Sequence, residues 1–268
     1  MRAAAALLAA AALFLLAAPA PAPAARTMTM SGQPITQALV ADLAYFYRHE
    51  VRHPARFALY GGGTGVGLAD TARGIVDGGL VSRELGPEDP PGLVLTRIAL
   101  SGVCLITNHL NPVPSLSRAQ LQDIVAARVT SWSQVSGAAR TDAIVPVTLD
   151  LGTGAARVFE SVFLDPDTPL AWQPVTLLLS TQARDFVEAT PAALAYADLA
   201  VTGPVHKVAY EGVACSRATI KSGAYPARRP LGIVTRGRPR GALARFLQWA
   251  RTSRTARRVI ATRYIPIR

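Results

Sequence analysis

Four short segments of the chain, each containing a serine or threonine and most containing glycine, stand where a run of apolar residues ends. They are MSGQPIT (30–36), GGGTG (61–65), VSREL (81–85) and LGTGA (151–155). Backbone N–H groups at the start of a helix have no partner inside the helix, and the helix dipole favours negative charge at that end. Glycine lets an anion approach these groups, and a nearby hydroxyl supplies a further donor. Together the four segments predict an anion-binding site.

The segment LDLGTGAARVF (149–159) is the most informative, because a helical run follows its glycines directly. The N–H groups of Gly154–Ala156 would lie at the start of this helix, so we expect them to contribute much of the binding. Arg157 is the only arginine close to this loop in sequence, and it is our candidate for the charge partner of the anion. The alternative, in which Arg157 points to solvent from the outer face of the helix, stays open.

Catalytic and nucleotide-binding residues do not occur in the required patterns. No frame starting at Gly61, Gly63 or Gly65 gives GxGxxG, and the chain has no GxxxxGK[ST] segment. It has no GxSxG turn, and neither cysteine stands in a nucleophile motif. His49 and His53 stand four residues apart in YRHEVRHP (47–54), a spacing that can hold a metal ion on a helix. The segment is polar, so we interpret both histidines as solvated side chains. We therefore expect neither an enzyme nor a bound metal or cofactor.

Positive charge is concentrated in the last part of the chain. The formal net charge is +11, and residues 217–268 contain half of the 28 lysines and arginines and no aspartate or glutamate. Basic segments of this kind bind nucleic acid or anionic surfaces in some proteins. An exported protein rarely meets nucleic acid, however, and arginine-rich composition often reflects a biased genome. We expect no nucleic-acid partner.

The first residues have the composition of a secretory signal peptide. Met1 and Arg2 form a short basic region, an apolar run follows as far as Ala18, and small residues with prolines come next. We assign residues 1–25 to the signal peptide and expect a periplasmic protein. No cysteine lies near the cleavage region, so we expect no lipid anchor.

Cys104 and Cys215 are the only cysteines of the chain. In an oxidising compartment they can form one disulfide, which the loop-entropy estimate values at about 4 kcal/mol. The alternative is two buried free thiols, and both remain open at this point.

Strand-like and helical patterns alternate along the mature chain, which predicts an α/β architecture. RFALY (56–60) is typical of a strand that ends at a glycine loop, and residues 66–78 have a helical pattern. LVLTRIALSGVCLITN (93–108) indicates two buried strands on either side of Ser101 and Gly102.

Two helices are predicted in more detail. Ser117 and Gln120 form a capping box, which starts a helix at residue 118. Near the end of the chain, apolar residues recur at helical spacing and predict an amphipathic helix with one buried stripe. The stripe consists of Leu243, Phe246, Leu247 and Ala250.

Longer motifs, taken in order, resemble those of the periplasmic phosphate-binding proteins of ABC-type transporters. They are GGGTGVGLADTARGIVDGGLVSREL (61–85), NPVPSLSRAQLQDIVAARVTSWSQV (111–135), TPAALAYADL (190–199), IKSGAYPARRPLGIVTRG (220–237) and RYIPI (263–267). The resemblance covers nearly the whole mature chain. It implies a two-lobed α/β fold of the periplasmic-binding-protein type with a ligand cleft between the lobes, residues 27–104 plus 210–268 forming lobe one and residues 105–209 forming lobe two. It also implies a monomer that binds phosphate or a related oxyanion and delivers it to an inner-membrane ABC permease.

The resemblance implies ligand-binding roles for Ser31, Gly63, Thr64, Ser82, Thr153, Gly154 and Ala155, to which we add Arg157 from its position in the chain. Several places depart from the family pattern. Leu149 and Leu151 stand where the family commonly has an arginine and an acidic residue, and Pro34 has no N–H to donate. Hydrogen bonds to charged groups contribute about 1.5–3 kcal/mol each. These losses keep a second hypothesis open, a degenerate or repurposed pocket in an envelope sensor or scaffold.

Overall fold

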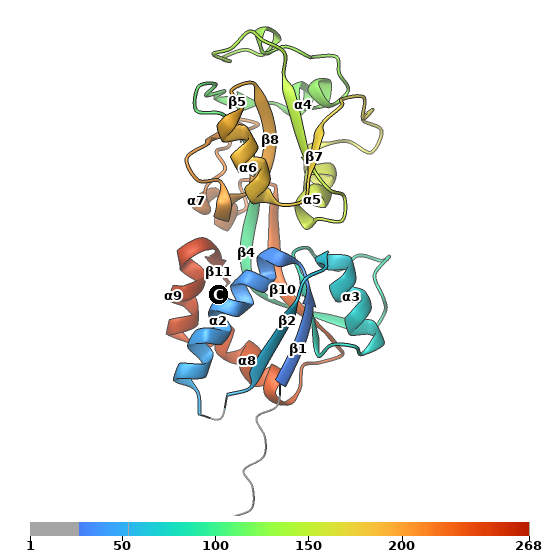
Figure 1. The fold of residues 1–268 in the computed structure, drawn as a ribbon, viewed down its shortest axis with the longest axis vertical. Coiled ribbons are helices and arrows are strands. Elements are labelled where there is room, and N and C mark those ends of the chain that lie inside the picture. The colour runs from blue at the N-terminus through green and yellow to red at the C-terminus, as the bar shows by residue number, and fades with distance from the viewer. Residues whose placement is uncertain (1–26, 53, 268) are drawn as a thin grey trace, which may run out of the picture.

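The computed structural model describes residues 27–52 and 54–267, so the expected signal peptide lies outside the described residues. Two α/β lobes are joined by the long strands β4 (Leu93–Thr107) and β10 (Arg228–Arg236) (Figure 1). The strands follow the order β2-β1-β3-β10-β4-β8-β6-β7, so one path of hydrogen-bonded strands runs from lobe one into lobe two. The predicted two-lobed α/β architecture is confirmed.

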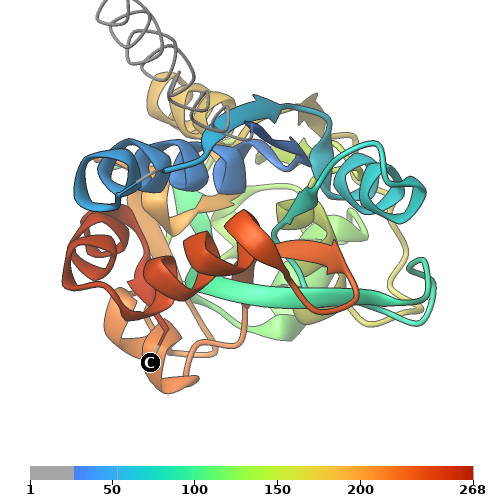
Figure 2. The same cartoon turned by 90° about the horizontal axis from the view of Figure 1, so that it is seen from below.

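Lobe one is a sheet covered by helices on both faces. Its elements are β1 (Thr27–Gly32), β2 (Arg56–Tyr60), β3 (Gly78–Val81), β11 (Ile265–Pro266), α2 (Pro34–Glu50), α3 (Gly63–Arg73), α8 (Gly241–Thr252) and α9 (Arg254–Arg263), with parts of β4 and β10. α2, α8 and α9 share an apolar core with one face of the sheet, and α3 covers the other (Figure 2). Because side chains alternate along a strand, Met28 and Met30 of β1 enter the first core while Ser31 faces α3.

Lobe two surrounds a second apolar core. Its elements are β5 (Ser115–Leu116), β6 (Val145–Leu149), β7 (Val175–Leu177), β8 (Ala193–Asp198), β9 (His206–Tyr210), α4 (Arg118–Val125), α5 (Gly154–Phe163), α6 (Ser180–Ala189), α7 (Arg217–Ser222) and the short turns η1 (Trp132–Gln134) and η2 (Leu199–Val201). Phe159 of α5 stacks on Tyr196 of β8 with 4.2 Å between ring centroids. The indole N–H of Trp132 donates to the carbonyl of Ala192 at 2.8 Å. These contacts fix α5 and η1 against the sheet.

The segment between residues 210 and 227 packs into lobe two rather than lobe one. Ile220 and Tyr225 are buried in the lobe-two core, and α7 lies beside this lobe in Figure 1. Cys215 forms a disulfide with Cys104, with 5.6 Å between the Cα atoms. The chain therefore returns to lobe one along β10. We expected the boundary between the lobes at residue 210, and in the structure it lies in β10. The disulfide also decides between the two alternatives for the cysteines.

β4 is one continuous strand and not the two strands expected around Ser101 and Gly102. Gly102 serves close packing instead of a turn. A Cβ atom added at Gly102 would lie 2.2 Å from the Cδ1 atom and 2.9 Å from the Cγ1 atom of Ile220, so any side chain at this position would displace Ile220 of α7. Among the described residues, no helix combines the length and the apolar content that crossing a membrane requires.

Candidate functional site

The strands that cross between the lobes place a buried arginine and a buried aspartate on one face of β4. Arg229 of β10 pairs in register with Ser101, and Asp198 at the end of β8 pairs with Val103. Residues two apart on a strand face the same side, and register partners share that side. The side chains of Arg229 and Asp198 are 1% and 5% exposed. β-sheet geometry therefore brings the two charges together at the junction of the lobes.

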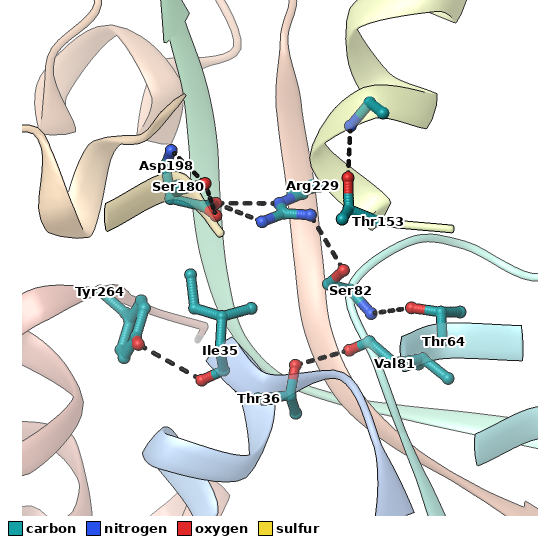
Figure 3. A network of polar contacts seen from close by, with 11 residues as sticks. Ile35, Thr36, Thr64, Val81, Ser82, Thr153, Ser180, Asp198, Arg229 and Tyr264 are labelled. Carbon is teal, nitrogen blue, oxygen red and sulfur yellow. Dashed lines mark hydrogen bonds and ion pairs between the residues drawn. The ribbon is translucent and has the colours of Figure 1, made fainter. Parts of the chain in front are cut away.

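Arg229 connects the two lobes through its guanidinium group (Figure 3). Its Nε donates to Asp198 Oδ1 at 3.1 Å, and its Nη2 donates to the same oxygen. Its Nη1 donates to Ser82 Oγ of lobe one at 2.9 Å. The hydroxyl of Ser180 donates to Asp198 Oδ2 at 3.1 Å. We call Arg229, Asp198, Ser82 and Ser180 the interlobe latch. The pairing satisfies two charges that would be costly to bury alone.

The lobes touch directly beside the latch, at two glycines. A Cβ atom added at Gly154 would lie 2.1 Å from Ser82 Oγ and 2.7 Å from Arg229 Nη1. A Cβ atom added at Gly63 would lie 3.4 Å from the carbonyl oxygen of Gly152. Gly63 also has a φ of +82°, which favours glycine. The structure therefore represents the lobes in a closed arrangement.

The start of α5 keeps two backbone donors available. Thr153 is the N-cap residue, and its hydroxyl accepts the N–H of Ala156 at 3.1 Å. The carboxylate of Asp150 accepts the N–H of Gly152 at 2.8 Å and so holds the preceding turn. Among the described residues, the N–H groups of Gly154 and Ala155 have no hydrogen-bond acceptor. Two of the three backbone donors expected at this loop are therefore free of acceptors in the described residues, whereas the N–H of Ala156 is used by the cap.

A cleft of about 730 Å³ opens between the lobes next to the latch. Its walls include the first residues of four helices, α2, α3, α5 and α6. These residues are Pro34, Gly63, Ala155, Ser180 and Thr181. Each helix directs the positive end of its dipole toward the cleft, and such ends favour anions. The four helix N-termini therefore give the cleft the electrostatic character of an anion-binding site.

The predicted site residues divide into three groups. Gly63, Thr153 and Ala155 line the cleft. Thr64, Ser82 and Gly154 lie together at the contact between the lobes, where the N–H of Ser82 donates to Thr64 Oγ1 at 3.4 Å. Ser31 and Arg157 lie elsewhere, and neither lines the cleft.

The positions of Ser31 and Arg157 have simple structural causes. The hydroxyl of Ser31 donates to Asp70 Oδ2 at 2.7 Å, on the α3 side of the sheet. Arg157 is exposed on the outer face of α5, as the alternative interpretation held. The helix turns a side chain by about 100° per residue, so the residues flanking Arg157 are buried while Arg157 is not. The arginine buried at the junction of the lobes is Arg229, whereas Arg184 and Arg263 line the cleft itself.

Sequence reasoning did not identify Arg229 or Asp198. A signal was present, because each is a charged residue next to a run of apolar residues, in AYAD (195–198) and RRPLGIV (228–234). Charged residues are rarely buried unless they are paired. That the two strands lie on either side of β4 is a property of the sheet order, which no local pattern contains.

Two ionisable groups have shifted pKa values that bear on the site, Tyr264 in the cleft wall and Asp89 outside the cleft. Burial raises the pKa of Tyr264, which lines the cleft, to about 12, and the negative charge of Asp198 adds to the effect. The hydroxyl of Tyr264 donates to the carbonyl of Ile35 at 3.3 Å. Arg83, next to Ser82, turns away and pairs with Asp89 at 2.6 Å, which lowers the pKa of Asp89. Arg83 is therefore already engaged outside the cleft.

Within residues 27–52 and 54–267, the structure shows no group of three or more histidine, cysteine, aspartate or glutamate side chains that could hold a metal ion. The polar groups that line the cleft include backbone amides, hydroxyls, the carboxamide of Gln33, the carboxylates of Asp150 and Asp198, and the guanidinium groups of Arg184 and Arg263. Such a set is suited to reversible binding of a polar ligand.

Two lobes, crossing strands and a cleft between them define the two-lobed architecture of a binding-protein fold. The family comparison agrees with this class. Residues 17–254 match the model of the PBP superfamily domain, which covers most of the chain. The chain belongs to the PBP superfamily of periplasmic binding proteins.

Curated relatives match part of the chain. The chain is 28% identical over 108 residues to the phosphate-binding protein PstS 2 of Streptococcus pneumoniae, covering 40% of this chain and 37% of the relative. It is 33% identical over 89 residues to the phosphate-binding protein PstS 2 of Streptococcus agalactiae, covering 33% of this chain and 30% of the relative. The matched part of the chain thus spans about a third of these relatives' length.

Solved structures match nearly the whole fold. One described as a phosphate ABC transporter substrate-binding protein with bound phosphate, from Clostridium perfringens, has a TM-score of 0.79 at 21% identity, covering 91% of this chain and 100% of that chain. An ABC-type phosphate transport receptor from Vibrio cholerae has a TM-score of 0.73 at 22% identity, covering 90% and 100%. At these identities the likeness establishes the shared fold.

Proposed function

We propose that this protein is an exported solute-binding protein that binds phosphate or a related oxyanion and delivers it to an inner-membrane ABC permease. The observation that carries the proposal is the convergence of the N-termini of α2, α3, α5 and α6 on one interlobe cleft. The N–H groups of Ala155, which lines the cleft, and of its neighbour Gly154 have no acceptor among the described residues and supply donors beside that point. The names of the curated relatives and of the phosphate-bound structural neighbour support phosphate as a ligand.

In this proposal, the helix ends hold the anion and the latch holds the lobes. The charge of Arg229 is already neutralised by Asp198, so its main contribution is to fix Ser82 and α5 at the base of the cleft. Backbone donors are retained whatever side chains stand in the loop, which makes the loss of the family's arginine at Leu149 tolerable. Hydrogen bonds to an anion contribute about 1.5–3 kcal/mol each.

The setting of this function follows from the signal-like residues 1–25 and from the superfamily. We propose a periplasmic protein that acts as a monomer, is not an enzyme and binds no nucleic acid. The second hypothesis, an envelope sensor or scaffold with a repurposed pocket, is favoured by one observation. Pro34 and Leu149 line the cleft at places where the resemblance implies polar ligand groups. Anion titration separates the two hypotheses.

The test is isothermal titration of the purified mature protein with phosphate and sulfate, together with a charge inserted at Thr181. Thr181 lies in the first turn of α6 and lines the cleft. Thr181→Asp places a negative charge there, and an acidic residue in the first turn suits the helix dipole, so the variant should fold. At about 6 Å and an effective dielectric constant of about 20, repulsion between two unit charges is about 2–3 kcal/mol. We expect Thr181→Asp to weaken anion binding by about 30- to 100-fold.

Thr181→Asn is the matched control, because it adds a similar side chain without the charge. We expect its affinity to stay within about threefold of that of the unmodified protein. Equal affinity of the Asp and Asn variants would place the anion away from this cleft. If the unmodified protein binds no anion at all, the sensor or scaffold hypothesis takes the place of the transport proposal.

A further inference from the structure

The interlobe cleft is lined by more apolar surface than an inorganic anion can use. Its walls include Ile35, Ala38, Leu149, Leu178, Leu179 and Val201. Leu178 and Leu179 precede α6 at the cleft and remain 65% and 43% exposed. Clefts that bind organic ligands are lined mostly by apolar side chains with a few convergent polar groups. Two exposed leucines at such a position indicate a ligand with an apolar part.

The volume of the cleft also indicates a ligand larger than an inorganic oxyanion. It measures about 730 Å³, within the range of about 300–1,000 Å³ found for drug-sized organic ligands. An inorganic oxyanion fills roughly 100 Å³, counted as about three water volumes of 30 Å³ each. Phosphate at the start of α5 would therefore leave most of the cleft, including the leucines, in contact with solvent.

The side chain of Gln33 gives a separate indication of what the ligand must carry, a hydrogen-bond donor. Its side chain lines the cleft and the residue is 8% exposed, yet its Oε1 atom has no hydrogen-bond donor among the described residues. A buried acceptor without a donor is costly, so a ligand that brings a donor gains by satisfying it. The acidic hydroxyl of a singly ionised phosphate ester or phosphonate is such a donor.

Positive side chains border the same cleft. Arg184 and Arg263 contribute to its walls. Arg263 is 58% exposed and lies 3.9 Å from Asp42, and Arg184 pairs with Asp185 next to it in the chain. Of the carboxylates that line the cleft, Asp198 is paired with Arg229 and Asp150 accepts the N–H of Gly152. The helix N-termini therefore keep the polar part of the cleft suited to an anion, while the leucines form an apolar part.

Building on the proposed function, we propose that the ligand is an organic oxyanion with a compact apolar body, a short alkyl or aryl phosphate monoester or phosphonate. The oxyanion head lies against the N-termini of α5 and α6, and its acidic hydroxyl meets Gln33. The apolar body packs on Leu178, Leu179 and Ile35. Inorganic phosphate satisfies only the polar half of the cleft.

The experiment compares inorganic phosphate, phenyl phosphate and benzyl alcohol by isothermal titration against the purified mature protein. Phenyl phosphate joins both chemical features, and each of the other two probes carries only one. We expect phenyl phosphate to bind at least about tenfold more tightly than phosphate, a difference of about 1.4 kcal/mol. Benzyl alcohol should bind far more weakly than phenyl phosphate, because it lacks the charged head.

Variants of the exposed leucines test the place of the apolar body. Leu178→Ser and Leu179→Ser should each reduce the advantage of phenyl phosphate about threefold or more, and neither should change the affinity for phosphate. Leu110→Ser is the matched control, since Leu110 is 56% exposed and does not line the cleft. It should change neither affinity.

The outcomes separate the inference from the proposed function. Phosphate binding that equals or exceeds that of phenyl phosphate overturns the organic ligand and leaves oxyanion binding standing. Equal binding of benzyl alcohol and phenyl phosphate overturns the charged head. Leucine variants that behave like Leu110→Ser overturn the assigned apolar surface. Absence of binding by any anion overturns the proposed function and this inference with it.

Discussion

Removal of the guanidinium group at position 229 tests the interlobe latch. Arg229→Met keeps a long apolar stem while it removes the two donors to Asp198 and the donor to Ser82. Asp198, whose side chain is 5% exposed, would retain the hydroxyl of Ser180 as a hydrogen-bond partner and lose its counter-charge. A buried charge left in this state destabilises the fold strongly.

The magnitude follows from the contacts. Two hydrogen bonds to a charged group are worth about 1.5–3 kcal/mol each, and breaking a buried ion pair costs about 3–5 kcal/mol. For a chain of this size, each kcal/mol lowers Tm by about 2–4 °C, so Arg229→Met should lower Tm by roughly 6–20 °C. Asp198→Asn should lower Tm by a similar amount, because it leaves the guanidinium group of Arg229 buried without a negatively charged partner.

The assay is calorimetric unfolding of the two single variants and the double variant. Both single variants remove the same interaction. The loss in the free energy of unfolding of the double variant should therefore be smaller than the sum of the two single losses, by up to about 3 kcal/mol. Arg157→Met is the matched control at an exposed arginine, where substitutions usually change stability by no more than about 0.5 kcal/mol. Additive single losses, or an Arg229→Met variant as stable as Arg157→Met, would refute the latch.

Three further predictions concern the disulfide, the lobe contact and pH. The disulfide between Cys104 and Cys215 closes a separation of 111 residues, so Cys104→Ser should lower the free energy of unfolding in urea by about 4–5 kcal/mol, and a loss below about 1 kcal/mol would contradict this. Gly154→Ala should force the lobes apart, enlarge the radius of gyration in solution scattering and weaken anion binding at least about tenfold, whereas Gly65→Ala, which points into open space, should do neither. The phenol of Tyr264 stays protonated in the folded protein up to about pH 12 while the unfolded chain ionises near 10, so stability should fall over this interval. Tyr264→Phe should reduce that fall by about 2–3 kcal/mol in pH-dependent unfolding, and identical slopes would contradict the assignment.

The parts of the fold with strong local signals could be predicted from the sequence. The stripe Leu243, Phe246, Leu247 and Ala250 comprises the buried residues of α8, because helical periodicity alone determines which residues share a face. The capping box at Ser117 starts α4 for a similar reason, since its hydrogen bonds are made within one turn. In such cases the physical cause lies within a few residues of its effect.

Features that depend on distant segments could not be predicted. Gly102 looked like a break between strands, although its lack of a side chain serves contact with Ile220, 118 residues later in the chain. The candidate site shows the same limit. The loop around Gly154 was found from its own residues, whereas the pairing of Arg229 with Asp198 depends on which strands flank β4. Proximity in sequence makes Arg157 a candidate beside its solvent-facing alternative, and only the structure shows that the helix turns Arg157 outward.

The central claim, that an oxyanion binds in the interlobe cleft at the start of α5, is tested most directly by a crystal structure of the protein grown with arsenate. Arsenate has the shape and charge of phosphate, and its arsenic atom can be located by anomalous scattering. We predict an arsenic peak between the lobes, with arsenate oxygens within hydrogen-bond distance of the N–H groups of Gly154 and Ala155. Arsenic peaks confined to the outer surface, with the cleft free of anion at saturating arsenate, would contradict the claim.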